Sequence, residues 1–419
     1  MFLTRVRIEN FRSIAACDVR LGPLTVLAGP NAAGKSNFLD ALRFVRDALR
    51  TSPGQALEPR GGLEEILHRS PAGTRADSFR IRLDVTVPAP EPASEPGGER
   101  GALDASYLLE VGADPDPEPG ADGRPGIRRE ELLFPDRPDR PVLFAPPESE
   151  RQVRSDGWRD DLLLSKVSRR NRDAYAVARS LHSMRFYELH TPVLRDIDQT
   201  RSKRGDVVLG EQGESLARVL SFLARHRPWV KDTIDGYIST MIENAAGLDG
   251  KEFEEADLAY VVGRFLEDGS EDGSHRQVDR RSLSDGTLRL AGVLAALFQS
   301  RALNGSIPFV GIEEPEISLH PPVLGALYDA LLGASDNTQV MVTTQSADLL
   351  DNSGADPGHV LVVRDDGHGS TIGPIDETGR SLLADGVLTL PELLRSGEMR
   401  PESGVPLNLP HNLSEGGPE

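Results

Sequence analysis

Apolar and polar residues alternate over residues 2–8, as they do in a strand that buries one face. An apolar run at 24–28 predicts a second strand, and it ends in a Gly-Pro-Asn sequence that favours a turn. Over residues 36–49 apolar positions recur at steps of three and four, which is the spacing of a helix with one buried face. The chain is therefore expected to begin with two strands, a glycine-containing loop and a helix.

The pattern changes after a strictly alternating segment at 79–87, which predicts another strand. Residues 88–150 hold 13 of the 31 prolines, together with many Gly, Asp and Glu residues. Such a composition favours surface loops or local disorder over a packed core. In this part we expect loops at 88–100 and 113–126, and short strands at 105–111 and 127–134.

Helical spacing dominates the chain from residue 158 to residue 268. The segments that carry it are 158–184, 214–225 and 228–246. This part is expected to form a second, all-helical subdomain.

Strand patterns return towards the end of the chain, at 307–312, 339–343 and 359–363, with a helical pattern at 321–333. Strands that alternate with helices favour a parallel sheet that is covered by helices. From about residue 397 the sequence is rich in Gly, Pro and polar residues, and we expect a loose tail.

Charge and cysteine content restrict the function. The chain of 419 residues has a formal net charge of −19, so its surface as a whole repels nucleic acid and anionic membranes. Any such contact must use a local basic patch. The single cysteine, Cys17, excludes a disulfide framework and a cysteine-based zinc site. No apolar run reaches the roughly 20 residues of a membrane span, and no signal region begins the chain. We expect a cytoplasmic protein without membrane contact.

The sharpest motif is GPNAAGKS at residues 29–36, which matches the P-loop pattern GxxxxGK[ST]. Backbone N–H groups of such a loop, and the helix that follows, surround a chain of phosphates. Lys35 would reach the β- and γ-phosphates, and the Ser36 hydroxyl would complete a Mg²⁺ shell. The alternative is a plain glycine turn before a helix. The candidate nucleotide-binding residues are Gly29, Pro30, Asn31, Ala32, Ala33, Gly34, Lys35, Ser36 and Asn37.

A second motif places two carboxylates directly after an apolar strand, at Glu313 and Glu314. Open α/β sheets bind their ligands at the carboxyl ends of parallel strands. Glu313 would hold Mg²⁺, and Glu314 would polarise the attacking water. The alternative is a strand end followed by a solvated acidic turn.

A third motif, Ser284-Asp285-Gly286, precedes an apolar helix at 288–298. A serine and a glycine at a helix start can bind an anion. From these residues alone, an ordinary helix cap without a ligand is the favoured interpretation.

The motifs occur in the order IENFRSI, GPNAAGKSNFLDAL, LSDG, IEEPEISLHP and TTQSADLLD. This order resembles the ABC-type ATPases of the SMC and RecF group, in particular stand-alone AAA-family ATPases related to the OLD nucleases. The resemblance covers about residues 1–50 and 280–375. It implies an α/β P-loop NTPase fold: an ABC/SMC-like ATPase head with a mixed sheet flanked by helices and a largely helical inserted lobe.

The resemblance also implies a division of the chain into four parts. Residues 1–150 would form the N-terminal part of the ATPase head, with the Walker A loop and proline-rich surface loops. Residues 151–275 would form the inserted lobe, and residues 276–396 the C-terminal part of the head. Residues 397–419 would be the loose tail.

By resemblance, the cofactors are ATP and Mg²⁺. Gly29 to Ser36 would be Walker A, and Glu313 the Walker B acid, with glutamate where aspartate is more usual. Glu314 would be the catalytic base. Ser284, Asp285 and Gly286 would form the signature motif, which contacts the γ-phosphate of a nucleotide bound to a second subunit. Ser318-Leu319-His320 would lie at the dimer-facing D-loop, and residues 343–346 would be the switch segment.

The sequence departs from the family in two places. The switch residue is commonly histidine, but here the catalytic position is Gln345, which can hydrogen-bond a phosphate or a water but cannot carry a proton. Slow turnover or a sensing role is therefore more plausible. No convincing Q-loop glutamine follows the P-loop: Gln55 has a poor setting, and the turn at 60–65 would take that place.

The resemblance implies an ATP-hydrolysing switch that closes as a homodimer around two nucleotides. It would act in DNA repair or in defence against foreign DNA. No nuclease signature follows residue 350, and Asp365-Asp366 is expected in a hairpin turn, so a separate nuclease-like effector would cut nucleic acid. The alternatives are a nucleotide-dependent scaffold with little turnover and an ABC transporter ATPase subunit.

Several residues of the middle segment remain ambiguous. The basic clusters are candidate DNA contacts but are equally typical of solvated surface: 169–172, 201–204, and Arg276 with Arg280-Arg281. Trp158 and Trp229 are expected in the core. His182 and His190 are expected to be structural, since no zinc-ligand spacing surrounds them.

Overall fold

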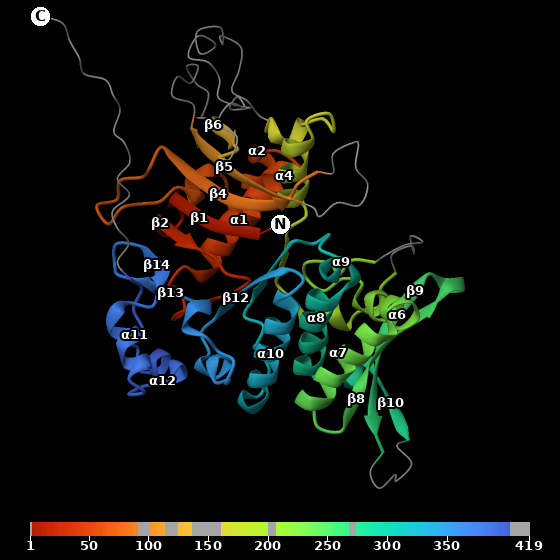
Figure 1. The fold of residues 1–419 in the computed structure, drawn as a ribbon. Coiled ribbons are helices and arrows are strands. Elements are labelled where there is room, and N and C mark those ends of the chain that lie inside the picture. Colours follow the sequence, from red (N-terminus) through yellow and green to blue (C-terminus); the bar gives the residue numbers. More distant parts are fainter. Residues whose placement is uncertain are drawn as a thin grey trace, which may run out of the picture.

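The computed structural model describes residues 2–90, 101–113, 125–135, 161–199, 207–267 and 274–402. Trp158, the basic cluster 201–204, most of the two loops predicted at 88–100 and 113–126, and residues 403–419 lie outside this part. The predicted α/β fold with a mixed sheet is confirmed, and its elements surround two hydrophobic cores (Figure 1).

A six-stranded mixed sheet occupies the centre of the molecule, in the order β14-β13-β3-β12-β11-β7. All neighbours are parallel except the hairpin of β13 and β14. This hairpin holds Asp365 and Asp366 at its turn, as predicted. The strands are β3 (Leu24–Ala28), β7 (Arg185–Tyr187), β11 (Phe309–Glu313), β12 (Gln339–Thr344), β13 (Val360–Asp365) and β14 (Ser370–Pro374).

The two hydrophobic cores lie on opposite faces of this sheet. Alternate residues of a strand belong to different cores, because successive side chains point to opposite faces. Val340 and Val342 of β12 pack on one face, and Met341 packs on the other. All three are almost fully buried. The strands are apolar throughout because both faces of this sheet are covered.

One face is covered by helix α1 (Lys35–Arg50) and by a five-stranded antiparallel sheet, drawn in red and orange in Figure 1. Phe11, Phe44 and Phe79 join the sheet to α1, with ring centroids 5.1–6.4 Å apart. The sequence did not indicate β2, whose apolar positions are irregular. The strands, in the order β2-β1-β4-β5-β6, are β1 (Phe2–Phe11), β2 (Ile14–Arg20), β4 (Ser78–Pro88), β5 (Ala102–Ala113) and β6 (Pro125–Leu133).

The other face is covered by α8 and α10, on which α6 and α7 of the inserted lobe pack. The predicted helical segments thus exist in large part. The helices of the described residues, apart from α1, are α2 (Pro53–Leu57), α3 (Leu63–Ile66), α4 (Arg172–His182), α5 (Thr191–Arg195), α6 (Leu216–His226), α7 (Pro228–Met241), α8 (Asp285–Phe298), α9 (Ser300–Leu303), α10 (Leu324–Ser335), α11 (Glu377–Ala384) and α12 (Leu390–Arg395). None of these helices is long and apolar enough to cross a bilayer.

The expectation that the inserted lobe is all-helical is wrong. A three-stranded antiparallel sheet follows α7, formed by β8 (Ala245–Phe253), β9 (Leu258–Leu266) and β10 (His275–Asp279), and it extends away from the central sheet (Figure 1). Gly250 lets β8 approach α6 closely, since a Cβ there would overlap the carbonyl oxygen of Ala217. Ala259 and Val261 of β9 are buried on the same core. Packing on α6 therefore decides the strand conformation.

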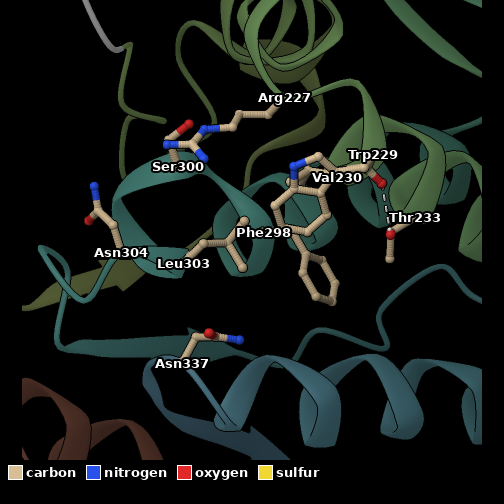
Figure 2. A pocket seen from close by; sticks show the side chains of 9 residues that line it. All are labelled: Arg227, Trp229, Val230, Thr233, Phe298, Ser300, Leu303, Asn304 and Asn337. Atoms are coloured by element: carbon tan, nitrogen blue, oxygen red, sulfur yellow. Dashed lines mark hydrogen bonds between the residues drawn. The ribbon is translucent and has the colours of Figure 1, made fainter.

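Trp229 does not lie in the core, as was predicted, because 60% of its surface is exposed. Helix α7 buries Val230, Ile234 and Ile238 on one side. Trp229 precedes Val230 by one residue, so its side chain leaves the helix on a different side. Its indole instead lines a cavity of about 240 Å³ beside Phe298 (Figure 2).

The expectation of a loose tail from about residue 397 is wrong for residues 397–402. The side chain of Met399 is fully buried, and the N–H of Glu402 donates to the carbonyl of Pro374 at 2.7 Å. Residues 397–402 thus pack against the end of β14.

Candidate nucleotide-binding site

The glycine-rich loop connects β3 to α1 at the carboxyl edge of the central sheet. The N–H of Gly29 donates to the carbonyl oxygen of Thr344, the last residue of β12, at 3.2 Å. On the other side, a Cβ on Gly29 would overlap the carbonyl oxygen of Val363 in β13. Only glycine therefore fits where the loop leaves the sheet.

The loop curls through two residues in the left-handed backbone region, Ala32 at φ 60° and Gly34 at φ 103°. Gly34 also lies against the side chain of Ser370, so a Cβ would not fit there. Alternating left- and right-handed residues turn backbone N–H groups towards one side, which forms a concave anion site. The P-loop prediction requires this geometry.

Lys35, the first residue of α1, is buried, with 5% of its surface exposed. Its ammonium group donates to the carbonyl oxygens of Gly29 at 2.9 Å and Pro30 at 2.8 Å. Burial lowers the pKa of Lys35, and the carboxylates of Glu314 and Glu316 oppose this effect. The lysine is thus held over the loop, facing the acidic strand end.

The sheet order brings Glu313 to the same edge as the P-loop. Glu313 ends β11, which pairs with β12, and β12 pairs with β3. Burial raises the pKa of Glu313, while a hydrogen bond from the Ser36 side chain and the charge of Arg43 lower it. Ser36 and Glu313 both line a cavity of about 400 Å³. A hydroxyl and a carboxylate in this arrangement suit Mg²⁺, which prefers oxygen ligands.

Glu314 has an unusual backbone conformation, with φ at 42°. Its N–H donates to the carbonyl oxygen and to the hydroxyl of Thr343, at 3.2 and 3.1 Å. Such a conformation in a residue other than glycine costs about 1–3 kcal/mol and is often found at functional sites. The two hydrogen bonds to β12 stabilise this turn. Glu314 lies directly after Glu313, the candidate Mg²⁺ ligand.

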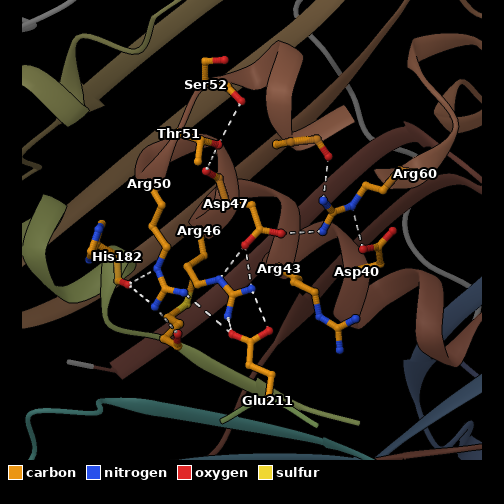
Figure 3. A network of polar contacts seen from close by, with 12 residues as sticks. Asp40, Arg43, Arg46, Asp47, Arg50, Thr51, Ser52, Arg60, His182 and Glu211 are labelled. Atoms are coloured by element: carbon orange, nitrogen blue, oxygen red, sulfur yellow. Dashed lines mark hydrogen bonds and ion pairs between the residues drawn. The ribbon is translucent and has the colours of Figure 1, made fainter. Parts of the chain in front are cut away.

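A network of arginines and carboxylates along α1 was not indicated by the motifs (Figure 3). Arg43 contacts Glu313 at 3.1 Å, and Arg46 pairs with Asp47 and Glu211. Arg43 and Asp47 follow Ser36 by seven and eleven positions, which places them on the same side of the helix. This spacing was the available signal, but only the structure shows that the same side faces the cavity.

Of the two segments considered for the Q-loop position, only the turn at 60–65 reaches the cavity of Ser36. Gln55 is exposed on α2 and does not line the cavity of Ser36. Arg60, from the turn named above, does line it, and donates to Asp40 at 2.8 Å and to Asp47 at 2.9 Å.

The signature motif lies apart from this cavity, at the start of α8. The Ser284 hydroxyl oxygen accepts the N–H of Thr287 at 3.1 Å, so Ser284 is a helix cap in this structure. Asp285 pairs with Arg195, and Gly286 packs on the carbonyl oxygen of Ser318. The motif therefore adjoins Ser318 of the predicted D-loop, and Ser284 is exposed to solvent.

The predicted switch segment, residues 343–346, begins with the last two residues of β12, which pair with the P-loop strand β3. Gln345 is exposed. The preceding Thr344 is fully buried and donates its hydroxyl hydrogen bond to Glu316. Glu316 belongs to the quoted motif IEEPEISLHP, but its sequence position indicated no role.

The basic clusters have different settings. Arg169 and Arg172 line a cavity of about 560 Å³ together with Arg179 and Tyr175. The guanidinium of Arg169 lies 5.8 Å from the centre of the Tyr175 ring. Arg276, in contrast, is exposed on β10.

Arg280 and the two histidines, His182 and His190, make contacts within the fold. Arg280 donates to the carbonyl oxygen of Arg195 at 2.7 Å. His190 lies 3.5 Å from Glu188, and the carbonyl of His182 accepts hydrogen bonds from Arg50. Within the described ranges, no group of His, Cys, Asp and Glu residues is arranged to hold a metal ion on its own.

The chain is similar to several known proteins. Residues 24–351 match the family described as "AAA domain, putative AbiEii toxin, Type IV TA system". The chain is similar to an OLD nuclease of Thermus scotoductus, with 46% identity over 43 residues, which are 10% of this chain and 8% of that protein. It is also similar to the DNA replication and repair protein RecF of Gloeobacter violaceus, with 36% identity over 88 residues, or 21% and 22% of the two chains.

Each of these matches thus covers less than a quarter of the relative's length. Among solved structures, the fold is similar to an SMC head bound to the C-winged helix domain of ScpA. The TM-score is 0.50 at 11% identity, over 89% of this chain and 97% of that chain. The family match covers well over half of the chain. The chain therefore belongs to this AAA-domain family, and its resemblance to the ABC-type ATPases of the SMC and RecF group, related to the OLD nucleases, is confirmed.

Proposed function

We propose that the chain is an ATP-hydrolysing switch that dimerises around two nucleotides. The observation that carries this proposal is the convergence of Ser36 and Glu313 on one cavity, next to the buried Lys35. A plain glycine turn and a solvated acidic turn would have no reason to meet there.

The residues would share the chemistry as follows. The P-loop amides and Lys35 bind the phosphate chain and neutralise charge that develops on it. When bound at Ser36 and Glu313, Mg²⁺ would supply further charge neutralisation at the phosphates. Glu314 orients the attacking water and accepts its proton. Gln345 donates a hydrogen bond to the γ-phosphate or to that water.

Dimerisation is supported by the position of the signature motif. Ser284 is exposed, and the motif does not line the cavity of its own chain. A second copy that approaches face to face would offer this helix start to the γ-phosphate. ATP would then hold two chains together, and hydrolysis would release them.

Turnover tests the enzymatic part of the proposal. Phosphate release is measured for the wild type, Lys35→Ala, Glu314→Gln and the control Glu110→Gln, whose carboxylate lies in the antiparallel sheet. Loss of the base is expected to lower kcat by about 10²–10⁴, and Lys35→Ala should lose ATP binding. Equal rates for the wild type and Glu314→Gln would contradict the role of Glu314.

Light scattering tests the dimer. With ATP, Glu314→Gln should have twice the mass of the nucleotide-free chain, because the nucleotide is bound but not cleaved. Ser284→Arg, combined with Glu314→Gln, should remain monomeric while still binding ATP, because the larger side chain blocks the opposing phosphate. A monomer at every ATP concentration would refute the sandwich.

A nucleotide-dependent scaffold with little turnover is the second candidate, since Gln345 cannot carry a proton. It is favoured if the wild type forms the ATP-bound dimer as persistently as Glu314→Gln and releases phosphate at the same negligible rate. Gln345→His would then be expected to raise turnover.

The partner of the switch is proposed to be DNA, together with a separate nuclease-like effector in repair or defence. Arg169, Arg172 and Arg179 beside Tyr175 form the basic surface that favours a phosphodiester. Fluorescence anisotropy with labelled DNA should show weaker binding and a smaller salt dependence for Arg169→Glu with Arg179→Glu. The control is Arg20→Glu, an exposed arginine at the end of β2. An equal loss in the control would refute this surface, and co-purification of the tagged chain with a nuclease would support the effector.

A further inference from the structure

Glu316 is a buried carboxylate that the roles described above leave unused. Only 7% of its surface is exposed. Its Oε1 accepts the hydrogen bond of the Thr344 hydroxyl, whereas Oε2 is buried without a hydrogen-bond partner among the residues that the structure describes. A buried carboxylate with an unmatched oxygen costs free energy. Packing alone therefore does not account for a glutamate at this place.

Thr344 connects this carboxylate to both loops that would meet the nucleotide. The carbonyl oxygen of Thr344 accepts the N–H of Gly29, where the P-loop begins. Its hydroxyl donates to Glu316 and accepts the N–H of Ser346 at 2.9 Å. The main-chain N–H of Gln345 lies close enough to Glu316 to lower its pKa. Through the Thr344 hydroxyl, one carboxylate thus connects the backbone on both sides of the Gln345 side chain.

The negative charge of Glu316 strengthens this arrangement. Hydrogen bonds to an ionised acceptor are roughly twice as strong as those between neutral groups. The charge also reaches the P-loop, because Glu316 and Glu314 are the two carboxylates that act on Lys35. The carboxylate therefore links the switch segment, the P-loop and the turn after β11.

We propose that Glu316 is a positioning residue of ATP hydrolysis, which fixes Gln345 beside the P-loop through the Thr344 hydroxyl and the backbone of the switch segment. The inference rests on the proposed ATPase function. Glu316 does not contribute to the P-loop amides that bind the phosphates. Its loss should therefore lower kcat and leave the affinity for ATP almost unchanged.

The experiment compares Glu316→Gln and Thr344→Val with the wild type. Both variants should lower kcat by about tenfold or more, while the dissociation constant of ATP changes by less than about twofold. The double variant should be no slower than the slower single variant, because both changes break the same connection. The control is Glu130→Gln in β6, a carboxylate with 2% exposure that accepts hydrogen bonds from the Tyr107 hydroxyl and from the N–H groups of Leu163 and Leu164.

The possible outcomes separate the two proposals. A kcat of Glu316→Gln close to that of the wild type overturns the positioning role, and so does a parallel loss of ATP affinity and kcat. A similar loss of kcat in Glu130→Gln would indicate a general structural effect and would also overturn it. Turnover that needs Glu314 but not Glu316 leaves the proposed function intact, whereas a wild type without turnover defeats both.

Discussion

Removal of the Arg43 side chain is expected to strengthen Mg²⁺ binding at Glu313. The guanidinium of Arg43 lies 3.1 Å from Oε1 of Glu313, and the two side chains are only 20% and 19% exposed. A cation thus already contacts the carboxylate that we assign to the metal. Mg²⁺ must displace this guanidinium or share the carboxylate with it, and either costs free energy.

The size of the effect follows from the geometry of the pair. At 3.1 Å and an effective dielectric constant of about 20, the Coulomb attraction is about 5 kcal/mol. Desolvation and side-chain ordering cancel most of it, and the net value for ion pairs with some solvent access is about 1 kcal/mol. This corresponds to about a fivefold change in an equilibrium constant. Arg43→Gln should therefore reach half-maximal activity at about one fifth of the Mg²⁺ concentration.

The assay is phosphate release at saturating ATP as a function of Mg²⁺, at about pH 8, where carboxyl groups are ionised. The control is Arg80→Gln, because Arg80 pairs with Glu9 and Glu110 at 3.1 and 3.0 Å in the antiparallel sheet. An unchanged or higher Mg²⁺ requirement of Arg43→Gln would refute the reasoning. If Arg80→Gln lowers the Mg²⁺ requirement by the same factor, the change in Arg43→Gln does not report on Glu313.

Three other experiments test the fold and the site. Gly29→Ala should lower the free energy of unfolding by about 1–3 kcal/mol, because its Cβ overlaps the Val363 carbonyl, whereas Gly236→Ala, with open space in α7, should raise it by roughly 0.5–1 kcal/mol. Urea unfolding measures both, and equal stabilities would contradict the packing. Burial raises the pKa of Glu316 from its ordinary value of 4.5, so its contribution to the free energy of unfolding falls as the pH rises above that value. The stability of Glu316→Gln relative to the wild type should therefore increase towards neutral pH. Thermal melts of both proteins between about pH 4 and pH 8 test this prediction. A difference in melting temperature that does not change with pH would refute it. Arg195→Ala should bind ATP but fail to dimerise, because the guanidinium holds the loop before α8 through three carbonyl oxygens; an ATP-dependent dimer in light scattering would disprove this.

Local patterns in the sequence were sufficient for the elements that form the site. The apolar run at 24–28, the GxxxxGK[ST] loop and the helical spacing after it predicted β3, the P-loop and α1. The run at 307–312 predicted β11 and, with it, the position of Glu313 at a strand end. These predictions succeed because periodicity and turn residues report on backbone conformation within a few residues.

Only the tertiary structure revealed the antiparallel sheet β8–β10 and the exposed position of Trp229. The glycine in β8 is explained only by the backbone of α6, because a Cβ on Gly250 would overlap the carbonyl oxygen of Ala217. Trp229 lies one position from the buried stripe of α7, and a propensity for burial does not say which side of a helix faces the core.

The sequence by itself determined which residues could bind a nucleotide, because the P-loop and the acidic strand end each have a local pattern. Only the tertiary structure decided that Ser36 and Glu313 share one cavity, since this depends on the strand order β3-β12-β11. The contacts of Arg43 with Glu313 and of Thr344 with Glu316 are likewise contacts between segments far apart in the chain. Strand order follows from the packing of the whole sheet between its two cores, and no local window of residues contains that information.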